Sequence, residues 1–247
     1  MGLLTVPFHL DERLDPSPLP FAGHTIDPEL PAGTSWERMT VLYENVAATI
    51  ATSDHPTVLS GDCTTSLGVL AGMQRAGLDP AIVWYDAHGD FNTDETSDSG
   101  YLGGMPVALV TGRGDKTVRE QLGLRPVADE DVLLADARDL DPRERTALED
   151  SGVRRVPVET VPLEAVPARP LYVHIDLDVL DPDELDGLHF PVRGGPALDD
   201  LADSLEGLAA AHHVAAVGIA GTWDAARIDR GEAIRVVTVV RDALGFH

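Results

Sequence analysis

Short apolar runs alternate with segments of helical periodicity along most of this chain. The segment 35–51 shows the helical spacing, because Met39, Leu42 and Val46 fall on one face of a helix. Alternation of this kind is typical of a mostly parallel sheet with helices on both faces. We therefore predict a three-layer α/β/α fold. No long linker divides the 247 residues, so one domain is expected over 1–247.

The expected elements follow from these two patterns. The expected strands are Leu3–Val6, Thr57–Leu59, Ala81–Tyr85, Val132–Ala135, Val153–Val156, Leu171–Ile175 and Val214–Ile219. The expected helices are Ser35–Ala51, Thr65–Arg75, Met105–Val110, Pro142–Asp150, Leu198–Ala211 and Glu232–Leu244. The Pro-rich segment Asp11–Pro31 is expected to cross the surface as an irregular loop.

The charge of the chain narrows the range of partners. It has 18 basic and 42 acidic side chains, a net charge of −24. Such a surface repels phosphate backbones and anionic membranes, so we expect neither nucleic acid nor membrane partners. Cys63 is the one cysteine, which excludes an intramolecular disulfide and fits a reducing compartment. Without an apolar run of about 20 residues, the chain reads as a soluble, cytoplasmic protein.

Carboxylates follow two of the expected strands. The run Asp86-Ala87-His88-Gly89-Asp90 comes after one of them, and His174-Ile175-Asp176-Leu177-Asp178-Val179-Leu180-Asp181-Pro182 includes the end of another. A carboxylate at the end of a buried strand is unfavourable unless a cation compensates it. Oxygen and imidazole donors together suit divalent metals. A metal site explains the pattern best, and helix capping by Asp is the alternative.

A third segment, Ser60-Gly61-Asp62-Cys63-Thr64-Thr65-Ser66, also follows a strand. The three segments together resemble the arginase/agmatinase family of ureohydrolases. The resemblance runs from about residue 60 to 195, and Asp-Ala-His-Gly-Asp-Phe-Asn at 86–92 fits the family pattern at every defined position. It implies an arginase-like fold and a pair of manganese ions that activate a water molecule.

The resemblance also implies a ligand set. Asp86 and Asp176 would each bridge both ions, Asp90 would bind the first ion, and His88 and Asp178 would bind the second. Asp90 is additionally the expected catalytic residue, because it can orient the nucleophile.

Cys63 stands where the family has a metal-binding histidine. A thiolate is a soft ligand that suits zinc or iron better than manganese. The first metal is therefore expected to bind weakly, to be zinc or iron, or to be absent. The alternative is that Cys63 is a buried core thiol.

Two further departures concern the reacting end of the substrate. Gly103 replaces a family histidine that lies near the reacting group, so water, Tyr101 or Asp90 would handle that proton. The family's glutamate near the end of the last strand is missing around Gly221, and Asp224 is the nearest carboxylate. Ordinary arginine hydrolysis is therefore not expected.

The amino-acid end of the expected substrate pocket resembles the family more closely. Asn92 and Ser99 match residues that hold an α-carboxylate, and Asp141 and Glu144 match residues that recognise an α-amino group. Asp141 and Glu144 are equally well explained as an N-terminal helix cap, since Pro142 follows the Asp.

The resulting prediction is a metal-dependent hydrolase of non-peptide C–N bonds in linear amidines. Its substrate would be a small guanidino or amidino compound, an α-amino acid derivative. The alternatives are a non-catalytic relative with this fold and a one-metal, deacetylase-like amidohydrolase. The resemblance also implies a homo-oligomer, a trimer or a hexamer. Two manganese ions per chain would favour the first function, one zinc ion the deacetylase-like enzyme, and none the non-catalytic relative.

Overall fold

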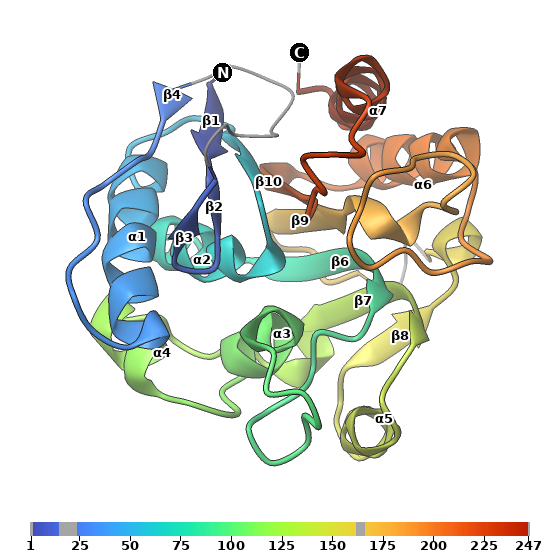
Figure 1. Cartoon of the computed structure of the whole chain (residues 1–247). Coiled ribbons are helices and arrows are strands. Elements are labelled where there is room, and N and C mark those ends of the chain that lie inside the picture. The colour runs from blue at the N-terminus through green and yellow to red at the C-terminus, as the bar shows by residue number, and fades with distance from the viewer. Residues whose placement is uncertain (1, 15–23, 162–165, 247) are drawn as a thin grey trace.

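The computed structural model describes residues 2–14, 24–161 and 166–246, and an eight-stranded sheet forms its centre (Figure 1). The strands lie in the order β4-β1-β5-β10-β9-β6-β7-β8, and each neighbouring pair is parallel. Their bounds are β1 Leu3–Val6, β4 His24–Thr25, β5 Thr57–Ser60, β6 Ala81–His88, β7 Val132–Asp139, β8 Arg154–Val156, β9 Leu171–Asp176 and β10 Val214–Ala220. A separate antiparallel hairpin joins β2, Phe8–His9, to β3, Glu12–Arg13.

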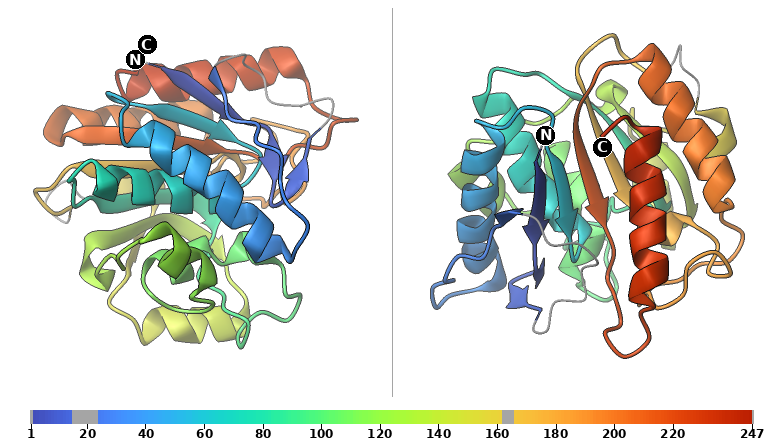
Figure 2. Two further views of the ribbon diagram at one scale, coloured as in Figure 1. Left: turned by 90° about the vertical axis from the view of Figure 1, so that its left-hand side faces the viewer. Right: turned by 90° about the horizontal axis from the view of Figure 1, so that it is seen from above.

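Helices cover both faces of the sheet (Figure 2). They are α1 Ser35–Ile50, α2 Ser66–Arg75, α3 Pro106–Val110, α4 Thr117–Leu122, α5 Pro142–Glu149, α6 Leu198–Ala211 and α7 Arg230–Ala243. Alternate residues of β6 enter different cores: Ile82 and Trp84 pack with α1 to α5, whereas Val83 and Tyr85 pack with α6 and α7. This two-sided burial explains why the central strands are apolar without interruption.

Local sequence signals account for the start of α1 and for its close packing against α2. The Thr34 side chain caps α1 by accepting from the N–H of Glu37, and the N–H of Thr34 donates to the Glu37 carboxylate, which completes a capping box. On α2, a Cβ at Gly72 would lie 2.7 Å from the carbonyl oxygen of Ala47 on α1. Glycine is therefore required there for the two helices to pack this closely.

The predicted α/β/α fold is confirmed, and its seven strands and six helices are all present with ends shifted by a few residues. The helix α4 was not predicted; it is a single short helix that Gly123 ends at a φ of 63°. The loop prediction for Asp11–Pro31 is wrong where β3 and β4 form, and its residues 15–23 lie outside the described ones. None of the helices among the described residues combines the length and apolarity needed to cross a membrane.

Candidate metal centre

The parallel register brings the three sequence segments to one edge of the sheet. Tyr85 of β6 pairs with Ile175 of β9, so the following residues, Asp86 and Asp176, lie side by side near the carboxyl ends of their strands. Asp176 pairs with Ala220 of β10, and Ala220 pairs with Ser60 of β5. Ligands of open α/β sheets bind at this carboxyl end of the strands.

Five of the expected ligands form two groups that share one carboxylate. Donor atoms of Cys63, Asp86 and Asp90 lie within 4.8 Å of one another, and so do those of Asp86, His88 and Asp178. Asp86 belongs to both groups. Two adjacent cations need a shared anionic ligand to offset their repulsion, and Asp86 is placed to supply it.

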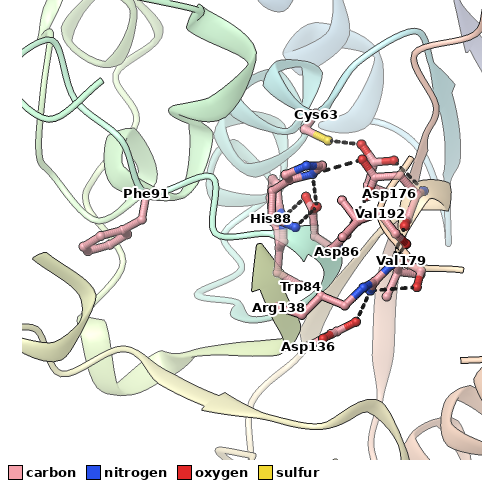
Figure 3. A network of polar contacts seen from close by, with 12 residues as sticks. Cys63, Trp84, Asp86, His88, Phe91, Asp136, Arg138, Asp176, Val179 and Val192 are labelled. Carbon is pink, nitrogen blue, oxygen red and sulfur yellow. Dashed lines mark hydrogen bonds and ion pairs between the residues drawn. The ribbon is translucent and has the colours of Figure 1, made fainter. Parts of the chain in front are cut away.

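Cys63 lies in this centre with its side chain pointing at the carboxylates (Figure 3). Its thiol donates a hydrogen bond to Oδ2 of Asp176 at 2.9 Å. Burial and the neighbouring carboxylates, Asp176 first, raise the pKa of the Cys63 thiol well above its ordinary value. The sixth expected ligand, Asp176, is thus joined to the first group through the sulfur.

The carboxylates of the centre are buried together and repel one another. Burial and the charges of neighbouring Asp side chains raise the pKa of Asp90 and Asp176 well above the usual range. The same causes raise the pKa of Asp178 to about 6. Buried acids that resist ionisation indicate a missing positive charge, which a divalent cation would supply.

His88 partly compensates this charge. Its Nδ1 lies 3.1 Å from Oδ2 of Asp178 and 3.3 Å from Oδ1 of Asp86. Burial lowers the pKa of His88, but hydrogen bonds and charges from Asp178 and Asp86 outweigh this effect and raise the pKa to about 12. Without a cation the imidazole therefore holds a proton, which a metal bound at this nitrogen would displace.

Asp90 has a left-handed backbone conformation, which is uncommon for a residue other than glycine. Its φ is 50°, in the left-handed region, and its carbonyl oxygen accepts hydrogen bonds from Val107 and Ala108 at the start of α3. Its Oδ2 is buried and has no hydrogen-bond partner among the described residues. A buried, unpartnered carboxylate oxygen beside two other donors fits a metal ligand, so the residues present fit a metal centre.

Arg138 holds the loop that follows Asp178 (Figure 3). Its guanidinium pairs with Asp136 and donates to the backbone carbonyl oxygens of Val179 at 3.1 Å and Val192 at 2.6 Å. It also donates to the carbonyl oxygen of Asp178 itself, at 3.3 Å. No sequence pattern marks the contacts with Val179 and Val192, because they are made to backbone atoms more than 40 residues away.

Aromatic rings support the centre from within the sheet. The rings of Trp84 and His174 stack with centroids 3.7 Å apart, and Trp84 Nε1 donates to Oδ2 of Asp86 at 3.1 Å. Burial lowers the pKa of His174 to about 3, so this imidazole stays neutral. His174 is the one departure from the family pattern in its segment, and it packs below the ligands.

A cavity of about 470 Å³ opens over the carboxylates and is large enough for an amino-acid-sized molecule. Asn92, Ser99, Asp141 and Glu144 all line it, as expected for substrate contacts. Asn92 is buried and donates to Oδ2 of Asp141 at 3.3 Å. Ser99 and Asp141 lie at the exposed rim.

Glu144 also stabilises the backbone around the cavity. Its carboxylate accepts hydrogen bonds from the backbone N–H groups of Phe91 at 2.8 Å and Asp141 at 3.2 Å, the second within a capping box of α5. Burial is the main cause that raises the pKa of Glu144 to about 7. Helix capping, the alternative explanation for this residue, is therefore present in the structure.

Three further residues line the cavity. Tyr101 is one of the groups expected to handle the proton in place of the family histidine, whereas Phe190 and Thr222, which follows the end of β10, had no expected role. Asp224 does not line it, and its carboxylate accepts from the backbone N–H of Ala226 at 2.9 Å instead. The position two residues after the end of β10 would have identified Thr222, since Asp62 lies two residues after the end of the neighbouring β5 and also lines the cavity.

A family model described as the arginase family matches residues 19–227. The chain belongs to the arginase family. The arginase of Bacillus subtilis (strain 168) is 36% identical over 167 residues, 62% of this chain and 56% of that protein. The N(omega)-hydroxy-L-arginine amidinohydrolase of Streptomyces lavendulae is 35% identical over 173 residues, 65% of this chain and 62% of that protein.

The chain therefore aligns with less than two thirds of the length of these curated relatives. A solved structure of arginase from Bacillus cereus superimposes with a TM-score of 0.86 and 24% identity, over 99% of this chain and 97% of that one. This superposition establishes that the arginase-family fold extends through nearly the whole chain.

Proposed function

We propose that this arginase-family protein hydrolyses a C–N bond of a small guanidino or amidino compound at a centre of two manganese ions. The observation that carries the proposal is the pair of ligand groups that share Asp86. Two cations bound there would lower the pKa of a water molecule, so that hydroxide is available near neutral pH.

The acidic residues, His88 and Cys63 would hold the two ions between them. Cys63, Asp86, Asp90 and Asp176 would hold the first ion, and Asp86, His88, Asp176 and Asp178 the second. Asp90, whose second oxygen has no protein partner, would also orient the nucleophile. Zinc or iron is the alternative for the first position, because a thiolate prefers softer metals. A homo-oligomer, a trimer or a hexamer, stays a prediction from the resemblance, and a cytoplasmic location stays a prediction from the composition.

The substrate is proposed to be an α-amino acid derivative. Asn92 and Ser99 offer hydrogen-bond donors to an α-carboxylate, and Asp141 offers an acceptor to an α-amino group at the cavity rim. Glu144 would contribute less, since its carboxylate already accepts two backbone hydrogen bonds. At the distal end, Thr222 is polar but uncharged, so a full guanidinium charge would lack a carboxylate partner there.

The lack of a carboxylate at the distal end of the cavity favours a substrate whose distal group is less basic than a guanidinium. We expect slow or no turnover of L-arginine, and of agmatine, which has no carboxylate. N-hydroxylated guanidines and amidines need less charge compensation and should react faster. A relative that is 35% identical is named for N(omega)-hydroxy-L-arginine, which supports this choice.

The test is product release from a panel of these compounds, with manganese, zinc or iron added to the metal-depleted protein. L-Arginine turnover near the ~10 per second typical of enzymes would contradict the substrate proposal. Metal content per chain decides the wider question. Two manganese ions support the proposal, one zinc ion would favour a deacetylase-like enzyme, and no metal would favour a non-catalytic relative.

Asp86→Ala and Asp176→Ala should each abolish both metal binding and hydrolysis, because each residue would bridge the two ions. Asp94→Ala is the matched control, since Asp94 is an exposed aspartate outside the cavity. Full metal occupancy in either bridging variant would contradict the dinuclear centre.

A further inference from the structure

Tyr101 places a phenol group in the cavity above the carboxylates. Its hydroxyl lies 2.8 Å from Nε2 of His9, although 92 residues separate the two in sequence. The two rings are tilted, with centroids 5.9 Å apart. Phe190 also packs against the phenol ring, with a centroid separation of 5.3 Å. The Tyr101 side chain is thus held by two aromatic neighbours.

Gly103 leaves the room that this phenol occupies. A Cβ built at Gly103 would overlap the ring carbons and the hydroxyl oxygen of Tyr101. A side chain at 103 and the observed position of Tyr101 therefore exclude each other. The φ of Gly103 is not in the left-handed region, so the space taken by Tyr101 is what requires glycine here.

His9 is fixed by the hairpin of β2 and β3, which sits on the loop carrying Cys63. The N–H of Leu10 donates to Oδ2 of Asp62 at 2.5 Å, with a left-handed φ of 54° at Leu10. A Cβ at Gly61 would overlap the carbonyl oxygen of Phe8, so hairpin and loop are in close contact. The imidazole is therefore positioned relative to the metal centre.

Hydrolysis of a C–N bond needs a proton for the leaving nitrogen, and few cavity groups can supply one. The carboxylates of the centre would bind cations, and Glu144 accepts two backbone hydrogen bonds. Burial and the charges of Asp62, Cys63, Asp90 and Asp176 raise the pKa of Tyr101 well above its ordinary value, which keeps the phenol protonated.

We infer that Tyr101 is the proton donor of the proposed hydrolysis and that His9 positions it. This inference rests on the proposed function. With Nε2 of His9 as the hydrogen-bond donor, the phenol proton is free to face the cavity. The C–N bond breaks with its electron pair on the leaving nitrogen, which takes the proton from Oη of Tyr101. Water supplies the hydroxyl group that joins the carbon, and its remaining proton returns to the phenolate through His9.

The first experiment compares Tyr101→Phe with the wild type, both loaded with manganese. The expected result is a fall in kcat of about 10²–10⁴-fold with little change in KM or in metal per chain. The fall should shrink for substrates whose leaving nitrogen is less basic. Tyr85→Phe is the matched control: it also removes a buried phenol hydroxyl, one that bonds Ser204 on the opposite face, and should keep full activity.

His9→Ala should lower kcat in the same way, and added imidazole should restore part of the rate. A merely structural role for His9 would show no such rescue. Gly103→Ala should displace the Tyr101 phenol and lower kcat. The double variant Gly103→Ala/Tyr101→Phe should be no slower than Tyr101→Phe alone, because both substitutions act on the same phenol group.

The outcomes separate this inference from the proposed function. Turnover that persists in Tyr101→Phe at the wild-type rate overturns the role of Tyr101 and leaves the hydrolase proposal standing. Absence of turnover in the metal-loaded wild type across the substrate panel contradicts the hydrolase proposal and removes the inference with it.

Discussion

Sγ of Cys63 lies 2.9 Å from Oδ2 of Asp176, although β5, which precedes Cys63, and β9, which ends at Asp176, are separated by β10. The contact exists because both side chains extend past the end of the sheet and meet above Ala220. A thiol in this position is a direct neighbour of the proposed metals, so its chemistry should set which metal is bound.

The first prediction concerns the metal preference of Cys63. Cys63→His should strengthen manganese binding by supplying a borderline nitrogen donor, and Cys63→Ser should weaken it roughly 10-fold or more. Zinc affinity should fall in Cys63→Ser, because a thiolate is a strong zinc ligand. Isothermal titration of the metal-depleted proteins measures this, and equal affinities in all three would show that Cys63 only packs the core.

Metal binding should release protons. His88 holds a proton between Asp86 and Asp178, with its pKa raised to about 12, and the Cys63 thiol is protonated as well. Because metal must displace these protons, affinity should rise with pH between 6 and 8. Titration in buffers of different ionisation enthalpy counts the protons, and His88→Ala should release fewer. A buffer-independent heat would contradict this account.

Arg138→Ala should loosen the loop that carries Asp178. The change leaves Asp136 without its ion pair and four backbone carbonyl oxygens without their donor, so we expect a loss of roughly 3–5 kcal/mol. Arg138→Lys should rescue little, because an ammonium group cannot reach several acceptors as a planar fork does. Urea unfolding measures both, with Arg145→Ala on the exposed side of α5 as control.

Glu144 should make the metal-depleted protein less stable as pH rises. Its pKa is raised from 4.5 to about 7 on folding, equivalent to ~3 kcal/mol. A carboxyl group with a raised folded-state pKa favours the folded protein below 4.5, and this stability is lost as pH rises through 7. The stability difference between the wild type and Glu144→Gln should therefore change with pH.

Unfolding of both proteins at pH 5 and pH 7.5 measures that difference. The wild type should lose stability relative to Glu144→Gln between the two values. Glu149→Gln, at an exposed position of the same helix, should show no such trend. A constant difference across this range would mean that Glu144 titrates normally.

The positions of Asp86 and Asp176 could be predicted from the sequence, because parallel strands of one sheet end at the same side of it. Apolar runs followed by Asp86 and by Asp176 predict that both residues leave a parallel sheet at the same edge, and the register brings them together. The fold followed from the same alternation. Cavity positions such as Asn92 were located through the resemblance alone, because no periodicity marks them.

Contacts between distant loops could not be predicted in this way. His9 meets Tyr101 only because a two-residue strand pairs in a hairpin, and such short strands have no pattern of their own. Arg138 acts through backbone carbonyl oxygens, which carry no side-chain signature. Asp224 is the nearest carboxylate in sequence to the missing glutamate, but it does not line the cavity and accepts a hydrogen bond from the N–H of Ala226 in a turn after β10.

The left-handed backbone at Asp90, with a φ of 50°, opposes conformational stability. Glycine would adopt this conformation without strain and would also remove a buried carboxylate that repels its neighbours. Asp90→Gly should therefore yield a metal-depleted protein that is more robust and chemically inert. Under the proposed function, an aspartate at this position lowers the stability of the metal-depleted protein and supplies a ligand that glycine cannot supply.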